Sequence, residues 1–202
     1  MKGIEKLASY FQTFPGIGPR QARRFVYFLL RQDKPVVKEI SDLIAKLQDK
    51  ISECTLCHRL YEADGYADVC DICGSSQRDT TLLMVVEKDA DLDVFEKSGI
   101  YKGRYFVLGG TLPLLESMPV KLRTDALVKY VKDRGSDLKE IILATGAHPE
   151  GELTADHVRS LLEDSARTHG ITLSLLGRGL STGTELEYSD KETLRNALLN
   201  RK

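Results

Sequence analysis

The chain has 202 residues, of which 42% are hydrophobic and 29% charged, which is typical of a globular protein with one substantial core and a small satellite domain. No apolar run approaches membrane-spanning length, and no basic segment leads into an apolar stretch at the start, so we expect neither a membrane partner nor secretion. The net charge of −1 is uneven, because residues 1–60 carry eleven Lys and Arg against six Asp and Glu, whereas the remainder is acidic. The basic end therefore suits nucleic acid.

Apolar residues at helical spacing predict three helices at the start of the chain, near residues 4–11, 19–32 and 36–51. We expect the core-facing residues of the second helix to be Ala22, Phe25, Phe28 and Leu29. The third helix gathers its apolar residues on one side, at Val37, Ile40, Leu43, Ile44 and Leu47.

The turn between the first two helices contains Gly16 and Gly18, which can adopt positive φ, and Pro19, which suits a first helical turn. Arginines follow on the second helix, at Arg20, Arg23 and Arg24, and no acidic residue occurs between Glu5 and Asp33. This arrangement resembles the helix-hairpin-helix unit, in which glycines, a helix N-terminus and arginines hold DNA phosphates without reading bases. The alternative is a rigid connector beside a solvated basic face.

All four cysteines lie in two C-x-x-C pairs separated by twelve residues, at Cys54, Cys57, Cys70 and Cys73. Such pairs fit a tetrahedral Zn²⁺ site, one per chain, and four thiolates leave no open position for chemistry. We therefore expect a structural zinc knuckle whose loss leaves the following domain largely folded. His58 is expected to be a surface residue and not a ligand. Unrelated reduced thiols or a redox pair are the alternative.

From Thr81 onward, strands and helices alternate. Strands are expected at 82–86, 105–108, 140–145, 171–176 and 184–188. Helices are expected to begin at Asp89, near Leu122, at Thr154 and at Ser189. This alternation predicts a parallel sheet covered by helices on both faces, and so a multidomain α+β and α/β protein.

Carboxylates follow two of these strands, with Glu87 after the first and Glu150 and Glu152 after the third. The placement resembles the Toprim domain, which binds Mg²⁺ with a glutamate and an Asp-x-Asp at these strand ends, although here a Glu-x-Glu stands in the second position. The alternative is that these glutamates are simply solvated. Because residues 146–149 offer no Lys or Arg to stabilise the charge that develops in phosphoryl transfer, we expect the three glutamates to dock a basic partner, with any Mg²⁺ binding weak and incidental.

The order of parts resembles the RecR family of bacterial recombination mediators over essentially the whole chain. The corresponding domains are a helix-hairpin-helix at 1–53, the zinc knuckle and linker at 54–79, a Toprim-like domain at 80–176 and a C-terminal segment at 177–202. Residues Arg20 and Arg24 fall where the family has basic residues implicated in DNA binding. Departures are a longer loop between the cysteine pairs and altered loops at 111–116 and 145–149.

The resemblance implies a cytoplasmic, nucleoid-associated protein without enzymatic activity. It implies a ring-shaped tetramer that binds single- and double-stranded DNA and acts with RecO, and often RecF, to help load RecA onto single strands coated by single-strand-binding protein. The rival interpretation is a Mg²⁺-dependent Toprim nuclease or topoisomerase using Glu87, Glu150 and Glu152. A nucleotide hydrolase finds no support, because the loop at 177–183 lacks the Gly-Lys-[Ser/Thr] of a phosphate-binding loop.

Overall fold

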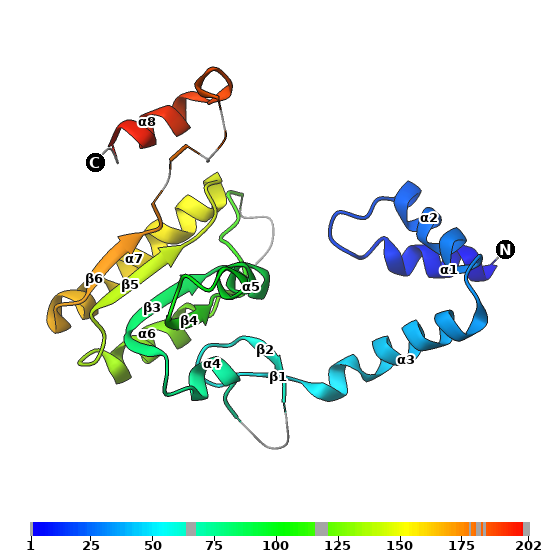
Figure 1. Ribbon diagram of the computed structural model, residues 1–202, viewed down its shortest axis with the longest axis horizontal. Helices are drawn as coiled ribbons and strands as arrows, with labels where there is room; N and C mark the ends of the chain where they lie inside the picture. The colour runs from blue at the N-terminus through cyan, green and yellow to red at the C-terminus, as the bar shows by residue number, and fades with distance from the viewer. Residues whose placement is uncertain are drawn as a thin grey trace. The chain divides into compact units, whose positions relative to one another are not determined.

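The computed structural model describes residues 2–63, 68–115, 121–177, 179–180, 183 and 185–199. The chain divides into two compact units, Met1–Ile51 and Ser52–Lys202 (Figure 1). Among the described residues, every helix is too short or too polar to cross a lipid bilayer.

The first unit contains α1 (Lys2–Phe11), α2 (Pro19–Leu29) and α3 (Lys34–Lys50). Helices α1 and α2 pack on each other around a small buried core. Its members are Ala8, Ala22 and Val26, with Ile4, Phe11 and Ile17 partly buried beside them. The three predicted helices are therefore present, with ends within a few residues of those expected.

The predicted core face of α2 is partly wrong. Val26 is buried, whereas Phe28 is 59% exposed. The reason is that the main contact of α2 among the described residues is with α1, so a narrower stripe than the sequence offers is enough to cover it. The apolar stripe of α3 is also largely exposed to solvent: Leu43, Ile44 and Leu47 are 60 to 65% exposed.

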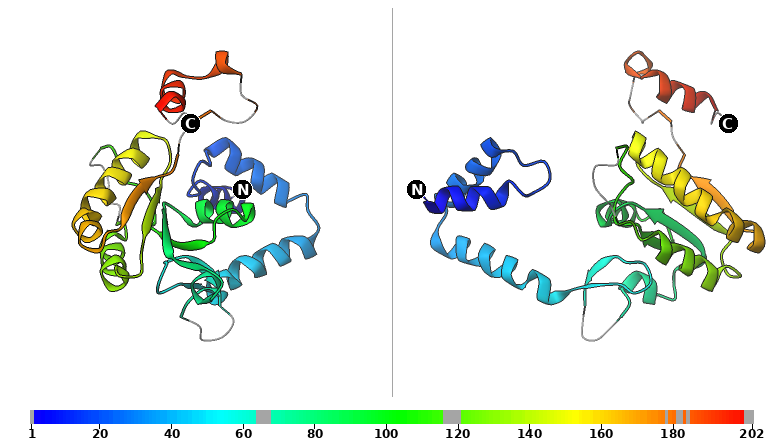
Figure 2. Two further views of the ribbon diagram at one scale, coloured as in Figure 1. Left: turned by 60° about the vertical axis from the view of Figure 1, so that its left-hand side comes forward. Right: turned by 180° about the vertical axis from the view of Figure 1, so that it is seen from behind.

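The second unit is built on a four-stranded parallel sheet. Its strands, in spatial order, are β4 (Gly103–Val107), β3 (Asp79–Val86), β5 (Glu140–Ala144) and β6 (Thr172–Leu175). Helices α5 (Asp89–Ser98), α6 (Thr124–Arg134) and α7 (Pro149–His169) connect the strands (Figures 1 and 2). This confirms the predicted α/β architecture.

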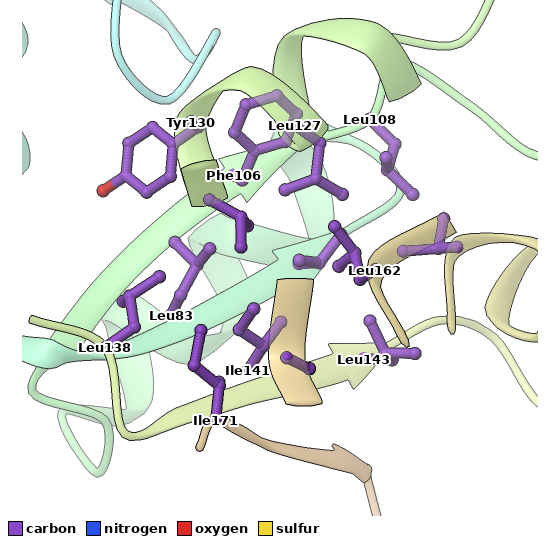
Figure 3. Close-up of a cluster of buried hydrophobic side chains, with 14 of the residues drawn as sticks. Leu83, Phe106, Leu108, Leu127, Tyr130, Leu138, Ile141, Leu143, Leu162 and Ile171 are labelled. Atoms are coloured by element: carbon purple, nitrogen blue, oxygen red, sulfur yellow. The ribbon is translucent and has the colours of Figure 1, made fainter. Parts of the chain in front are cut away.

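Successive residues of each strand face opposite sides of the sheet, and each side has its own core. One side carries Leu83, Phe106 and Ile141, which pack against residues of α6 and α7 such as Leu127 and Leu162 (Figure 3). The other side carries Met84, Val86, Tyr105 and Val107, which pack with Leu92 of α5 and with all four cysteines.

One predicted helix start and one predicted strand are wrong. Helix α7 begins at Pro149, not at Thr154, because proline suits the first turn and the His148 side chain caps it by accepting the Gly151 N–H. The predicted strand at 184–188 instead contains a 3₁₀ helix at Leu186–Tyr188, in which the Tyr188 N–H donates to the Glu185 carbonyl. It is followed by α8 (Lys191–Leu199). Thr184 and Glu116, which belong to the predicted strand and to the 111–116 loop, lie outside the described residues.

Candidate metal centre and nucleic-acid interface

The four cysteines form one buried cluster. Their Sγ atoms all lie within 4.8 Å of one another, and no cysteine residue is more than 6% exposed. Within the described chain, this is the one group of three or more His, Cys, Asp or Glu side chains close enough to share a metal ion. Four sulfurs at this separation can hold a metal such as zinc.

Two tight turns bring the sulfurs together. In the first, the N–H of His58 donates to the Cys54 carbonyl, and His58 takes the left-handed conformation at φ 61°. The second is closed by the short helix α4 (Asp71–Gly74), and an ion pair of 2.9 Å between Arg59 and Asp71 links the turns. Flanking strands β1 (Ile51–Glu53) and β2 (Leu60–Glu62) pair beside the first turn. These three short elements were missed by sequence reasoning.

The thiols influence one another strongly. Hydrogen bonds with Cys57, Cys70 and Cys73 lower the pKa of the Cys54 thiol, whereas contacts with Cys54, Cys57 and Cys70 raise that of Cys73. Four thiolates confined this closely would repel one another, and a divalent cation would supply compensating positive charge.

His58 is not part of the sulfur cluster. Its Nδ1 lies 2.6 Å from Glu53 Oε1, and its ring meets Phe106 edge to face with centroids 5.2 Å apart. Its side chain is only 22% exposed, so it is not the surface residue that the sequence suggested. The contact of His58 with Phe106 connects the cysteine turn to the sheet. A hydrogen bond of 2.8 Å from Val107 N to the Cys57 carbonyl makes a second connection.

The two glycines of the hairpin have different backbone conformations. Gly16 has φ +75°, whereas Gly18 is an extended N-cap residue with φ −83° and ψ 171°. A Cβ at either position would meet nothing within 4 Å, so the hairpin backbone is open to an incoming group. Gly18 has no side chain to cap α2, whose first turn also lacks acidic residues.

The three hairpin arginines, Arg20, Arg23 and Arg24, are exposed. Among the described residues none of them joins an ion pair, and the side-chain contact of Arg24 is a hydrogen bond of 3.4 Å to the Gln21 oxygen. Free cations beside a helix N-terminus can neutralise phosphates without contacting base edges.

The three predicted glutamates do not form a cluster. Glu87 is 5% exposed and accepts the Gly146 N–H at 2.7 Å, whereas Glu150 and Glu152 lie in the first turn of α7. His148, whose role the sequence interpretation overlooked, has its Nε2 3.8 Å from Glu87 Oε1 and its Nδ1 3.1 Å from Glu150 Oε2. As the sequence indicates, residues 146–149 include no Lys or Arg, and His148 Nδ1 accepts the Gly151 N–H at 3.1 Å.

The combination of a helix-hairpin-helix unit, a four-cysteine centre and a Toprim-type sheet defines a multidomain protein of the class that works on nucleic acid. Family models match in the same order: "RecR, helix-hairpin-helix" at residues 4–47, "Toprim domain" at 81–176 and "RecR, C-terminal" at 179–202. The chain is 37% identical over 200 residues to recombination protein RecR of Cereibacter sphaeroides, covering 98% of this chain and 96% of the relative.

Two further relatives carry the same name. Identity is 36% over 199 residues to recombination protein RecR of Bacteroides fragilis, with 98% of this chain and 92% of the relative covered. It is also 36% over 199 residues for that of Anaplasma phagocytophilum, with coverage of 98% and 97%. The chain belongs to the RecR family of recombination proteins.

Proposed function

We propose that this protein binds DNA through the 14–24 hairpin and serves as a recombination mediator in DNA repair. The observation that carries the proposal is the open Gly16–Gly18 backbone beside three exposed arginines without ion-pair partners among the described residues. Because these groups suit phosphates and not base edges, binding should be indifferent to sequence and should include single and double strands.

The test is binding of labelled oligonucleotides by the variant Arg20→Glu with Arg24→Glu, which should lose DNA affinity. A matched control is Lys102→Glu with Lys139→Glu, which changes the net charge equally at exposed positions of the second unit. If the hairpin variant is folded and binds as tightly as the control, the hairpin is only a connector.

For the metal centre we propose Zn²⁺, one per chain, held by Cys54, Cys57, Cys70 and Cys73. Four sulfur donors suit zinc and leave no position for substrate, so its contribution is to folding. Elemental analysis of freshly reduced protein should give about one zinc per chain.

The family resemblance further suggests the partners RecO and RecF, a ring-shaped tetramer, and assistance to RecA on single strands covered by single-strand-binding protein in the cytoplasm. The exposed stripe of Leu43, Ile44 and Leu47 supports self-association, because such residues gain from burial. Glu150 and Glu152 offer negative charge for docking a basic partner such as RecO, and their charge reversal should impair that docking while sparing DNA binding.

The alternative is a Mg²⁺-dependent Toprim nuclease or topoisomerase. Burial of Glu87 and its bond to the Gly146 N–H argue against it, because phosphoryl transfer needs carboxylates gathered around a metal. Plasmid nicking that requires Mg²⁺ or Mn²⁺ and disappears in Glu87→Gln would establish the enzyme instead.

A further inference from the structure

Glu87 is the one charged residue in the described part of the chain that is buried as a whole. Burying a carboxylate is costly unless it is hydrogen-bonded or paired. Here Glu87 Oε1 accepts the Gly146 N–H at 2.7 Å and faces His148 Nε2 at 3.8 Å. Its Oε1 is therefore hydrogen-bonded from within the chain, by an amide that lies just before α7.

His148 occupies the space between the carboxylates. Its Nδ1 lies 3.1 Å from both the Gly151 N and Glu150 Oε2, while its Nε2 faces Glu87. The imidazole thus lies beside one oxygen of Glu87 and one oxygen of Glu150, two of the carboxylates that could otherwise hold a cation. Carboxylate oxygens are the ligands that Mg²⁺ prefers, and an imidazole between them takes that place.

Two glycines keep this network compact. A Cβ at Gly146 would come within 2.5 Å of the His148 ring, and a Cβ at Gly151 would come within 2.2 Å of the Gly146 carbonyl oxygen and 3.0 Å of Glu87 Oε1. On the side of Gly146 and Gly151, the space beside Glu87 Oε1 is therefore filled by backbone and by the imidazole. A hydrated Mg²⁺, which keeps several of its waters, would have to displace these groups on that side.

We propose that His148 and the Gly146 amide replace the divalent cation of Toprim proteins, so that Glu87 is a positioning residue. It fixes the 145–148 loop and thereby the first turn of α7, where Glu150 and Glu152 lie. This inference concerns whether the carboxylates near Glu87 can bind a metal ion. It does not depend on the proposed DNA or partner binding, since its test involves neither.

The test is Mn²⁺ titration of the zinc-loaded full chain, followed by electron paramagnetic resonance of free Mn²⁺. The wild type should bind no Mn²⁺ at this site. His148→Asp replaces the imidazole by a carboxylate and should gain one bound Mn²⁺ per chain, which the additional change Glu87→Gln should remove. If the wild type binds Mn²⁺ and Glu87→Gln abolishes it, the site is a metal site and the proposal fails. If folded His148→Asp gains nothing, His148 is not what closes the site.

The positioning role has its own readout in hydrogen exchange of the Gly146 amide. Glu87→Gln keeps an oxygen that can accept this N–H, so protection should persist, whereas Glu87→Ala should speed exchange at least tenfold. Equal exchange in wild type and Glu87→Ala, both with intact overall unfolding temperature, would show that Glu87 does not hold the loop.

Discussion

At the scale of single residues, the backbone conformation of Gly16 sets it apart from Gly18. Only Gly16 has positive φ, at +75°, and a side chain would have open space at both positions. Because the left-handed region costs a non-glycine residue about 1 kcal/mol, Gly16→Ser should lower the local stability of the α1–α2 pair by about that amount.

Gly18→Ser is the matched control for that prediction. Position 18 is an extended N-cap, where serine is favoured, so this change should be neutral or stabilising. The measurement is native-state hydrogen exchange of α2 amides, which reports the free energy of local opening. Similar losses in both variants would mean that φ at Gly16 is not what limits the hairpin.

A second residue-scale prediction concerns Gly151. A Cβ there would lie 2.2 Å from the Gly146 carbonyl oxygen, a backbone atom that cannot move without shifting the start of α7. Gly151→Ala should therefore destabilise the second unit by roughly 2 kcal/mol, as overpacking does. Gly177→Ala, where a Cβ meets nothing within 4 Å, is the control and should leave the thermal unfolding temperature nearly unchanged.

At the scale of elements, the cysteine turns are part of the core of the α/β sheet. Cys54, Cys57, Cys70 and Cys73 share one buried cluster with Met84, Val86 and Tyr105, and Cys57 accepts a hydrogen bond from β4. This packing argues against the expectation that the sheet stays largely folded when the knuckle is lost.

Metal removal should accordingly destabilise the whole second unit. Chelation of the wild type, or Cys70→Ser, should lower its unfolding free energy by several kcal/mol, because structural metal binding contributes directly to folding. Circular dichroism would follow the unfolding, and Zn²⁺ addition should restore the wild type but not Cys70→Ser. An α/β sheet that unfolds at the same temperature with and without metal would show that the cysteine module is independent.

At the scale of the whole molecule, the longer segments could be predicted from sequence, because β3 contains a continuous apolar run and α1 carries Ile4, Ala8 and Phe11 at helical spacing. The short elements β1, β2 and α4 could not, since tight turns around the cysteines create them. The C-terminal stretch Leu186–Tyr188 alternates like a strand but forms local hydrogen bonds instead.

The candidate sites also differ in how far they could be predicted from the sequence. Cysteine spacing was enough to indicate the metal cluster, because its ligands are near in sequence. The burial and hydrogen bonding of Glu87 could not be predicted from the sequence. Its hydrogen-bond donor, Gly146, is distant in the chain and lies beside it because β3 pairs with β5. The role of His148 follows from where α7 begins, which the sequence placed five residues too late.

The central claim, DNA binding by phosphate neutralisation at the hairpin, is tested most directly by the salt dependence of affinity for single strands of unrelated sequence. The account predicts equal affinities and a steep slope of log K against log salt, which becomes shallower by roughly 0.7 for each of Arg20, Arg23 and Arg24 changed to Ala. Lys102→Ala should leave the slope unchanged. A slope that is the same for wild type and the triple arginine variant, or an affinity that depends strongly on sequence, would contradict it.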